Sequence, residues 1–255
     1  MNETSSPTAA VLIIGNEILS GRTQDANLNV IAKKLAGIGV RLCEARVVPD
    51  IEADIVKAVN ELRARYTYLF TTGGIGPTHD DITAEAVGRA FGMPVIEHPE
   101  ARARLLAYYT DTGINPARLR MARVPQGATL IDNPISAAPG FRIENVYVLA
   151  GVPGIMQAMM DNVAAQLRHG PAIHSIAISG AVAESTVAEE LANIAAHWPQ
   201  LDIGSYPWFR QGKYGTSLVV RGTDKTAVQA AADEIFAMIE KRGGKPEIEI
   251  TPSAA

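Results

Sequence analysis

Residues 71–83 read Thr-Thr-Gly-Gly-Ile-Gly-Pro-Thr-His-Asp-Asp-Ile-Thr and join three glycines to two carboxylates. The residues at 67–72 are β-branched and aromatic enough for a buried strand, and 82–91 repeat apolar side chains at helical spacing. Glycine lets the backbone approach a ligand closely, and N–H groups beside a helix N-terminus can surround an anion. The stretch therefore predicts a loop, between a strand and a helix, that binds a phosphate or a nucleotide.

The same loop also has a purely structural explanation, which stays open at this point. Gly73, Gly74 and Gly76 can simply shape a turn, and Asp81 can cap the helix that follows. The loop has neither the Gly-Lys-Ser/Thr ending nor the Gly-x-Gly-x-x-Gly spacing of the standard nucleotide loops. The segments around it must therefore decide between a turn and a binding loop.

The composition limits the classes of protein to consider. The 255 residues are 47% hydrophobic, which is enough for one large domain or for a main domain with a smaller one. The formal net charge of -4 argues against a nucleic-acid surface, so the expected ligands are small molecules. Cys43 is the only cysteine, and no apolar run approaches the roughly 20 residues that span a bilayer. We expect a cytoplasmic protein without an internal disulfide or a membrane span.

Strand and helix patterns alternate along the first part of the chain. Strand-like runs at 11–14, 40–48, 67–72 and 146–149 are separated by apolar residues at helical spacing, as in 28–38. This alternation predicts an α/β fold with a mostly parallel sheet sandwiched by helices.

The rest of the chain is less regular. Residues 101–123 read as largely helical, and the glycines and prolines of 127–140 read as loops. The arginines of the helical stretch are expected to form mostly a solvated face: Arg102, Arg104, Arg118, Arg120 and Arg123. After His169-Gly170-Pro171 the pattern becomes strand, helix, strand, strand, helix. We therefore predict a main domain at 9–170 and a small α+β domain at 171–245.

Polar residues and glycines follow the predicted strands of the main domain. Ligands of open parallel sheets bind beyond the carboxyl ends of the strands, so these residues are expected at one edge. They are Gly15, Asn16, Glu17, Ser20, Gly21, Asp50, Gly73, Gly74, Gly76, Thr78, Asp80, Asp81, Gly151, Pro153 and Gly154. Single members have structural explanations, since Asp50 can cap a helix and Glu17 can lie in a solvated turn. Carboxylates that gather without a cation would repel one another, so the whole set predicts a metal-assisted phosphate site.

Four stretches of the chain carry a recognisable set of motifs: Gly15–Gly21 followed by Asp25 and Asn27, Thr72–Thr83, Asn133–Phe141 and Val148–Met156. These motifs resemble the molybdopterin-binding, MoaB/Mog-like fold family. Within it, the chain is most similar to the amino-terminal domain of CinA proteins and to the matching domain of eukaryotic FAD synthases. The resemblance covers residues 9–168, and Gly204–Pro207 with Tyr214–Gly215 resembles the stretch that follows in FAD synthases.

The resemblance implies two chemistries, the adenylylation of molybdopterin and the metal-dependent cleavage of a nucleotide pyrophosphate. By position, Asp50 and Asp81 match the two acidic residues important in the molybdenum-cofactor enzymes, which makes them the candidate catalytic carboxylates. We expect Mg²⁺ or a similar ion to bind near Asp81, with Asp80 or Asp50 assisting. The resemblance makes the glycine loop a phosphate or pterin site. Ser136 keeps a hydroxyl for an anion, although Ile135–Ala138 stands where CinA proteins usually have Gly-Thr-Ala.

The leading interpretation is a metal-dependent pyrophosphatase that cleaves ADP-ribose or FAD to release AMP. The alternatives are a molybdenum-cofactor protein that binds or adenylylates molybdopterin, and a nucleotide- or pterin-binding protein without catalysis. The resemblance also implies a homo-oligomer, either dimer or trimer. Three aromatic residues of the small domain, Tyr206, Trp208 and Phe209, either line a base pocket or pack between domains.

Overall fold

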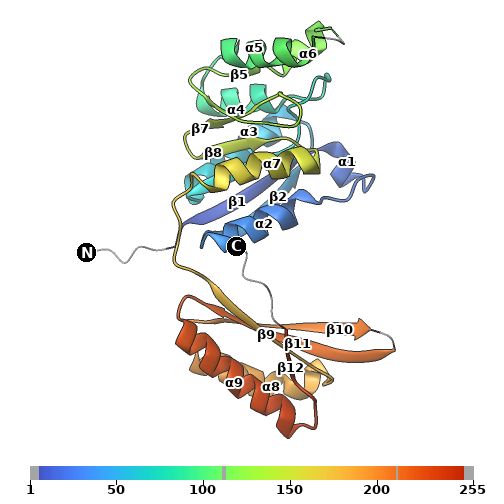
Figure 1. Cartoon of the computed structure of the whole chain (residues 1–255), viewed down its shortest axis with the longest axis vertical. Coiled ribbons are helices and arrows are strands. Elements are labelled where there is room, and N and C mark those ends of the chain that lie inside the picture. The colour runs from blue at the N-terminus through green and yellow to red at the C-terminus, as the bar shows by residue number, and fades with distance from the viewer. Residues whose placement is uncertain (1–5, 111–112, 211, 250–255) are drawn as a thin grey trace, which may run out of the picture. The chain divides into compact units, whose positions relative to one another are not determined.

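The computed structural model describes residues 6–110, 113–210 and 212–249. The chain forms two compact units, which divide between Gly170 and Pro171. Figure 1 shows the first unit in blue to yellow and the second in orange to red. Within the described ranges, no helix combines the length and the apolar character that a membrane crossing requires.

The first unit is built around a six-stranded sheet with the strand order β2-β1-β3-β8-β7-β6. Its strands are β1 (Thr8–Ile14), β2 (Arg41–Val48), β3 (Tyr68–Thr72), β6 (Thr129–Ile131), β7 (Gly140–Ile143) and β8 (Val146–Leu149). The strands β2, β1, β3 and β8 are parallel, and β7 is antiparallel to both β8 and β6. The predicted mostly parallel α/β fold is confirmed. The prediction of loops at 127–140 is wrong for β6 and for Gly140, the first residue of β7, because these strands are only three and four residues long.

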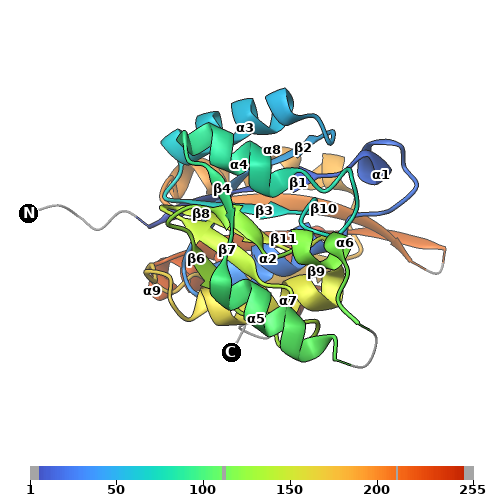
Figure 2. The ribbon, with the colours of Figure 1, turned by 90° about the horizontal axis from the view of Figure 1, so that it is seen from above.

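Helices cover both faces of this sheet. They are α1 (Asn16–Leu19), α2 (Asn27–Gly37), α3 (Glu52–Arg65), α4 (Thr83–Phe91) and α7 (Pro153–Ala164). Alternate residues of β1 enter opposite cores, so that Leu12 packs with α3 and α4 while Val11 packs with α2 and α7. Figure 2 shows α3 and α4 on one side of the sheet and α7 on the other. Burial on both faces explains why β1 reads as a continuous apolar run.

An inserted segment, residues 95–125, lies between α4 and β6. It contains β4 (Val95–Glu97), α5 (Pro99–Tyr108), α6 (Pro116–Arg120) and β5 (Arg123–Pro125), and β4 pairs antiparallel with β5. Proline stands at the start of both helices, where its missing N–H costs no hydrogen bond. The largely helical prediction for 101–123 is therefore correct for two short helices and wrong at Arg123, which begins a strand. Residues 111–112 of that prediction lie outside the described residues.

The second unit is a four-stranded antiparallel sheet with the strand order β10-β11-β9-β12. Its elements are β9 (His174–Gly180), α8 (Glu184–His197), β10 (Asp202–Arg210), β11 (Lys213–Gly222), α9 (Lys225–Lys241) and β12 (Glu247–Glu249). Asp224 caps α9 by accepting hydrogen bonds from the N–H groups of Thr226 and Ala227. Gly243 follows the end of α9 with φ +75, the left-handed conformation that glycine commonly adopts there. Among the three aromatic residues noted above, Tyr206 and Phe209 are exposed, and Trp208 donates to the Ser179 hydroxyl.

A charged network links β2 to the end of α3. Glu44 accepts hydrogen bonds from Arg46 Nη2 at 2.8 Å, from Arg65 Nη1 at 3.1 Å and from the Tyr66 hydroxyl at 2.8 Å. These contacts, the Arg46 bond above all and then the Tyr66 bond, hold the pKa of Glu44 below its ordinary value of 4.5. The neighbouring Cys43 is exposed.

Glu44→Gln is expected to lower the free energy of unfolding at pH 7 by about 1–2 kcal/mol, because charged hydrogen bonds are lost. The pKa of Glu44 is depressed in the folded state, so its stabilisation is present above its ordinary pKa of 4.5. It is lost as the pH falls through that value toward the folded-state pKa. Urea unfolding of the variant and the wild type should therefore show a difference that shrinks toward about pH 4. A difference of the same size at both pH values would contradict this role.

Candidate functional site

The candidate site lies at the edge where the carboxyl ends of β1, β3 and β8 meet. Hydrogen bonds join the loops that follow these strands to neighbouring strand ends. The Gly15 N–H donates to the Val48 carbonyl at 3.2 Å, and the Gly73 N–H donates to the Leu149 carbonyl at 3.3 Å. The structure thus brings together the predicted segments that follow the separate strands.

Gly73 brings the strand ends into direct backbone contact. Its φ is +100, and a Cβ atom there would lie 2.1 Å from the carbonyl oxygen of Ile14. A Cβ atom on Gly151 would in turn lie 3.2 Å from the Gly73 Cα. The floor of the site is therefore bare backbone, which only glycine permits at Gly73.

The loop after Gly73 is anchored by the start of α4 but leaves its own amides free. The Thr83 hydroxyl donates to the Gly73 carbonyl at 2.9 Å, and the Thr83 N–H donates to the Gly74 carbonyl at 3.0 Å. The N–H groups of Gly74, Ile75 and Gly76 have no hydrogen-bond acceptor within the described ranges of the chain. Successive free N–H groups of this kind are suited to binding an anion.

Asp81 organises the end of the loop. Its Oδ2 accepts hydrogen bonds from the Thr78 N–H at 2.7 Å and from the Thr78 hydroxyl at 2.5 Å. A Cβ atom on Gly76 would lie 2.7 Å from the same Oδ2, so glycine gives the carboxylate room. No described residue donates to Oδ1. Thr78 and Asp81, both predicted from the sequence, are thus in contact, and one carboxylate oxygen remains available to a ligand.

Asp80 is exposed beside Asp81. The Thr78 hydroxyl, whose one proton Asp80 shares with Asp81, lowers the pKa of Asp80 below its ordinary value, and the backbone amide of Asp80 itself lowers it further. Smaller contributions come from the charges of His79 and Arg120. Asp80 therefore stays charged at neutral pH, as a metal ligand must.

Asp50 has a positioning contact at the β1 end of the site. Its Oδ2 accepts a hydrogen bond from the Asn16 N–H at 2.8 Å. Asn16 and Glu17 begin the short helix α1, and the Ser20 hydroxyl donates to the Glu17 carbonyl at 3.3 Å. Gly21 has φ +72 and lies in the turn after this helix. The carboxylate of Asp50 thus holds the entrance of α1 rather than capping α3.

Asn27 was noted in the sequence only as part of a motif, and the structure places it at the same edge. Its Nδ2 donates to the Gly151 carbonyl at 2.8 Å, while its Oδ1 is buried without a partner among the described residues. The residue is 4% exposed. Pro153 and Gly154 lie exposed at the start of α7, at the same strand end as Gly151.

Ser136 belongs to a loop that Asn133 holds together. The Asn133 side chain is buried, donates to the Ser136 hydroxyl at 2.7 Å and to the Ala138 carbonyl at 2.8 Å, and accepts from two loop amides. Ala137 adopts φ +59, which is uncommon outside glycine. The described contacts of Ser136 lie within this loop, and its predicted anion contact remains a prediction.

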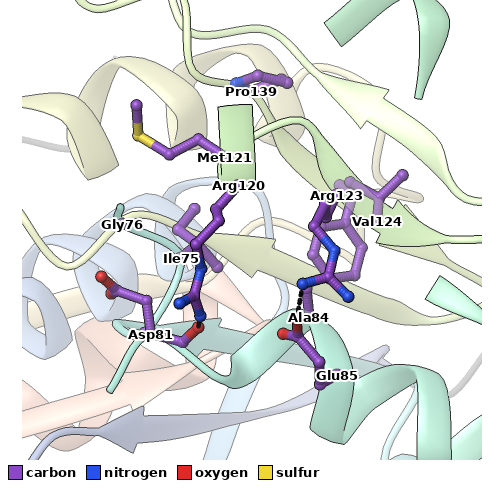
Figure 3. A pocket seen from close by; sticks show the side chains of 12 residues that line it. Ile75, Gly76, Asp81, Ala84, Glu85, Arg120, Met121, Arg123, Val124 and Pro139 are labelled. Carbon is purple, nitrogen blue, oxygen red and sulfur yellow. Dashed lines mark hydrogen bonds and ion pairs between the residues drawn. The ribbon is translucent and has the colours of Figure 1, made fainter. Parts of the chain in front are cut away.

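A small cavity opens on the α4 side of the glycine loop, with Arg120 and Arg123 of the inserted segment in its wall (Figure 3). Arg120 Nη2 donates to the Asp81 carbonyl at 3.4 Å, and Arg123 forms an ion pair with Glu85 at 2.9 Å. The expectation of a solvated arginine face is therefore wrong for Arg120, which is only partly exposed. No local sequence signal marks these arginines, because the fold of the inserted segment brings them to the loop.

The metal prediction can be compared with the side chains present. Within the described ranges, no three His, Cys, Asp or Glu side chains gather closely enough to form a metal site. Mg²⁺ is commonly held by one or two carboxylates, with water and substrate phosphates completing its shell. Asp81, with a free Oδ1, and the charged Asp80 fit that kind of site. They do not fit a site made of protein ligands alone.

Comparisons with known proteins divide the chain at the same place as its two compact units. A family model described as "Probable molybdopterin binding domain" matches residues 10–169. A second model, described as "FAD synthase, middle domain", matches residues 172–246. The first match includes the glycine loop, Asp50, Asn27 and the inserted segment.

Relatives match at both levels of sequence and structure. A protein of Aeropyrum pernix is 32% identical over 259 residues, which cover 95% of this chain and 95% of that protein. A CinA-like protein of Parasynechococcus marenigrum is 30% identical over 245 residues, which cover 91% of this chain and 58% of that protein. The crystal structure of the protein CinA from Thermoplasma acidophilum superposes with a TM-score of 0.60 at 31% identity, covering 63% of this chain and 98% of that one.

Proposed function

The chain belongs to the molybdopterin-binding domain family, of the MoaB/Mog-like and CinA type, and on that premise we propose that it is a divalent-metal-dependent nucleotide pyrophosphatase. Its substrate would be a nucleoside joined through a pyrophosphate, such as ADP-ribose or FAD, and one product would be AMP. The observation that carries the proposal is the run of free N–H groups at Gly74, Ile75 and Gly76 beside the Asp81 carboxylate.

The glycine loop would bind the pyrophosphate oxygens. Negative charge grows on these oxygens as the phosphoanhydride bond breaks, and fixed N–H donors stabilise such charge without reorganising. Gly73 and Thr83 hold the loop backbone in place through the close approach to Ile14 and the bond to the Gly73 carbonyl. The donors are therefore positioned before the substrate arrives.

The carboxylates would complete the site. Asp81 and Asp80 would hold a divalent cation, which supplies charge neutralisation and Lewis acidity to the pyrophosphate. Asp50, whose Oδ2 is occupied by Asn16, keeps Oδ1 free of described contacts and would orient the attacking water or accept its proton. Self-association, as a dimer or a trimer, is part of the same proposal.

The test is to incubate metal-free protein with ADP-ribose and with FAD, with and without Mg²⁺, Mn²⁺ or Co²⁺, and to quantify AMP by chromatography. We expect AMP to appear only when a divalent cation is added. A parallel incubation with molybdopterin and ATP measures ATP consumption. Pterin-dependent ATP consumption without AMP release from ADP-ribose or FAD would replace this proposal by molybdopterin adenylylation. Binding of either nucleotide without turnover under any metal would indicate a binding protein.

A further inference from the structure

Of the two arginines that line the cavity beside the glycine loop, Arg120 has the less satisfied side chain. A guanidinium carries five N–H donors. Among the described residues, that of Arg120 makes one hydrogen bond, from Nη2 to the Asp81 carbonyl, and its length of 3.4 Å is at the weak end. Figure 3 shows the side chain reaching from the inserted segment toward the loop at Asp81. Most of its donors are therefore available to a ligand.

Arg123 lines the same cavity but is already neutralised. Its Nη1 lies 2.9 Å from Glu85 Oε1, and Figure 3 shows this ion pair as a closed contact beside Ala84. The two arginines are thus chemically unequal, although they are three residues apart in sequence. An incoming anion would find its free positive charge at Arg120.

The dimensions of the cavity limit what can enter it. Its volume is about 20 Å³, which is enough for a single water-sized group. The loop residues Gly74, Ile75 and Gly76 line it together with Arg120, and Met121, Pro139 and Phe141 add apolar wall. A charged hydrogen bond is stronger next to apolar walls than in open water. One oxygen atom of a phosphoryl group would fit, while the phosphorus atom would stay at the mouth.

We propose that this cavity and its mouth form a subsite for one phosphoryl group of a diphosphate-containing ligand, in which Arg120 and the Gly74–Gly76 amides donate to the same phosphate. The inserted segment, residues 95–125, then supplies a phosphate-recognition residue to a loop that lies before it in the chain. Arginine suits this task because its planar fork matches two phosphate oxygens at once. The inference rests on the proposed pyrophosphate substrate, and it assigns a residue that the family motifs quoted above do not contain.

The experiment measures the binding of inorganic pyrophosphate to the full chain by titration calorimetry in the presence of EDTA, so that no cation contributes. Arg120→Gln is expected to weaken binding roughly 10- to 100-fold, the usual effect of losing hydrogen bonds to a charged group. Arg120→Lys keeps the positive charge but lacks the planar fork of the guanidinium. Its affinity for pyrophosphate should lie between those of the wild type and of Arg120→Gln. Arg102→Gln removes the same charge from α5 of the inserted segment, where Arg102 pairs with Glu97, and should bind like the wild type. Thermal unfolding of each variant reports whether its fold is retained.

Wild-type affinity in folded Arg120→Gln would overturn the inference, as would an equal loss in Arg102→Gln or no pyrophosphate binding by the wild type. The proposed function is judged separately, by AMP release from ADP-ribose and FAD. Pyrophosphate binding that depends on Arg120, with no AMP release, would support the subsite and reject the pyrophosphatase. Metal-dependent AMP release by the wild type, together with an unchanged pyrophosphate affinity in Arg120→Gln, would support the pyrophosphatase and reject the subsite.

Discussion

Asp81→Asn is expected to reduce metal-dependent AMP release from ADP-ribose at least about 100-fold, because the proposed cation would lose its charged ligand. The substitution keeps the size of the side chain and one oxygen that can accept from the Thr78 N–H, so the loop should keep its shape. The measurement is kcat and KM for AMP release at saturating Mg²⁺, with the unfolding midpoint as a check on folding.

Thr78→Val is the matched control for this prediction. It removes the hydroxyl that donates to Asp81 Oδ2 but keeps the backbone N–H contact and the carboxylate charge. If Asp81 acts through its charge, Thr78→Val should lose far less activity than Asp81→Asn. Equal losses in the two variants would show that Asp81 only closes the loop, which is the structural explanation that the sequence left open.

Gly73→Ala is expected to lower the free energy of unfolding by about 2–5 kcal/mol. One part of this cost is the left-handed backbone, since φ is +100 at this residue. The other part is steric, because the new methyl group would lie 2.1 Å from the Ile14 carbonyl oxygen and would force β1 and β3 apart. Urea unfolding measures the loss, and the same variant should no longer release AMP, since the loop amides lose their position.

Gly92→Ala is the control that separates the cost of the left-handed backbone from the cost of the steric clash. Gly92 also has a left-handed backbone, with φ +65, but a Cβ atom there meets nothing within 4 Å. Its cost should be limited to about 1–2 kcal/mol of backbone strain. The excess loss in Gly73→Ala over Gly92→Ala is the contribution of the close approach between strands. Equal losses of unfolding free energy in the two variants would mean that the strand ends can move apart freely. The inference that the floor of the site is rigid backbone would then be wrong.

The resemblance to molybdopterin-binding, CinA-type proteins is confirmed by the family match and by the CinA structure. Local patterns were sufficient for the long elements: the helical spacing at 28–38 belongs to α2, and the strand predicted at 40–48 is β2. These elements have periodic burial, which is visible in sequence. The short strands β6 and β7 have no such period, and only the pairing of β6 with β7 and of β7 with β8 makes them strands.

The sequence by itself determined which loops would meet at the candidate site, because glycines and carboxylates placed directly after buried strands must gather at the carboxyl edge of a parallel sheet. It named Gly73, Thr78 and Asp81 on that ground. Only the tertiary structure decided which groups are free to bind. Hydrogen bonds between distant segments occupy Asp50 Oδ2, leave Asn27 Oδ1 and the loop amides without partners, and bring Arg120 across to the loop. The hydrogen bond from Asn27 Nδ2 to the Gly151 carbonyl joins residues 124 positions apart. No local sequence pattern records contacts between such distant residues.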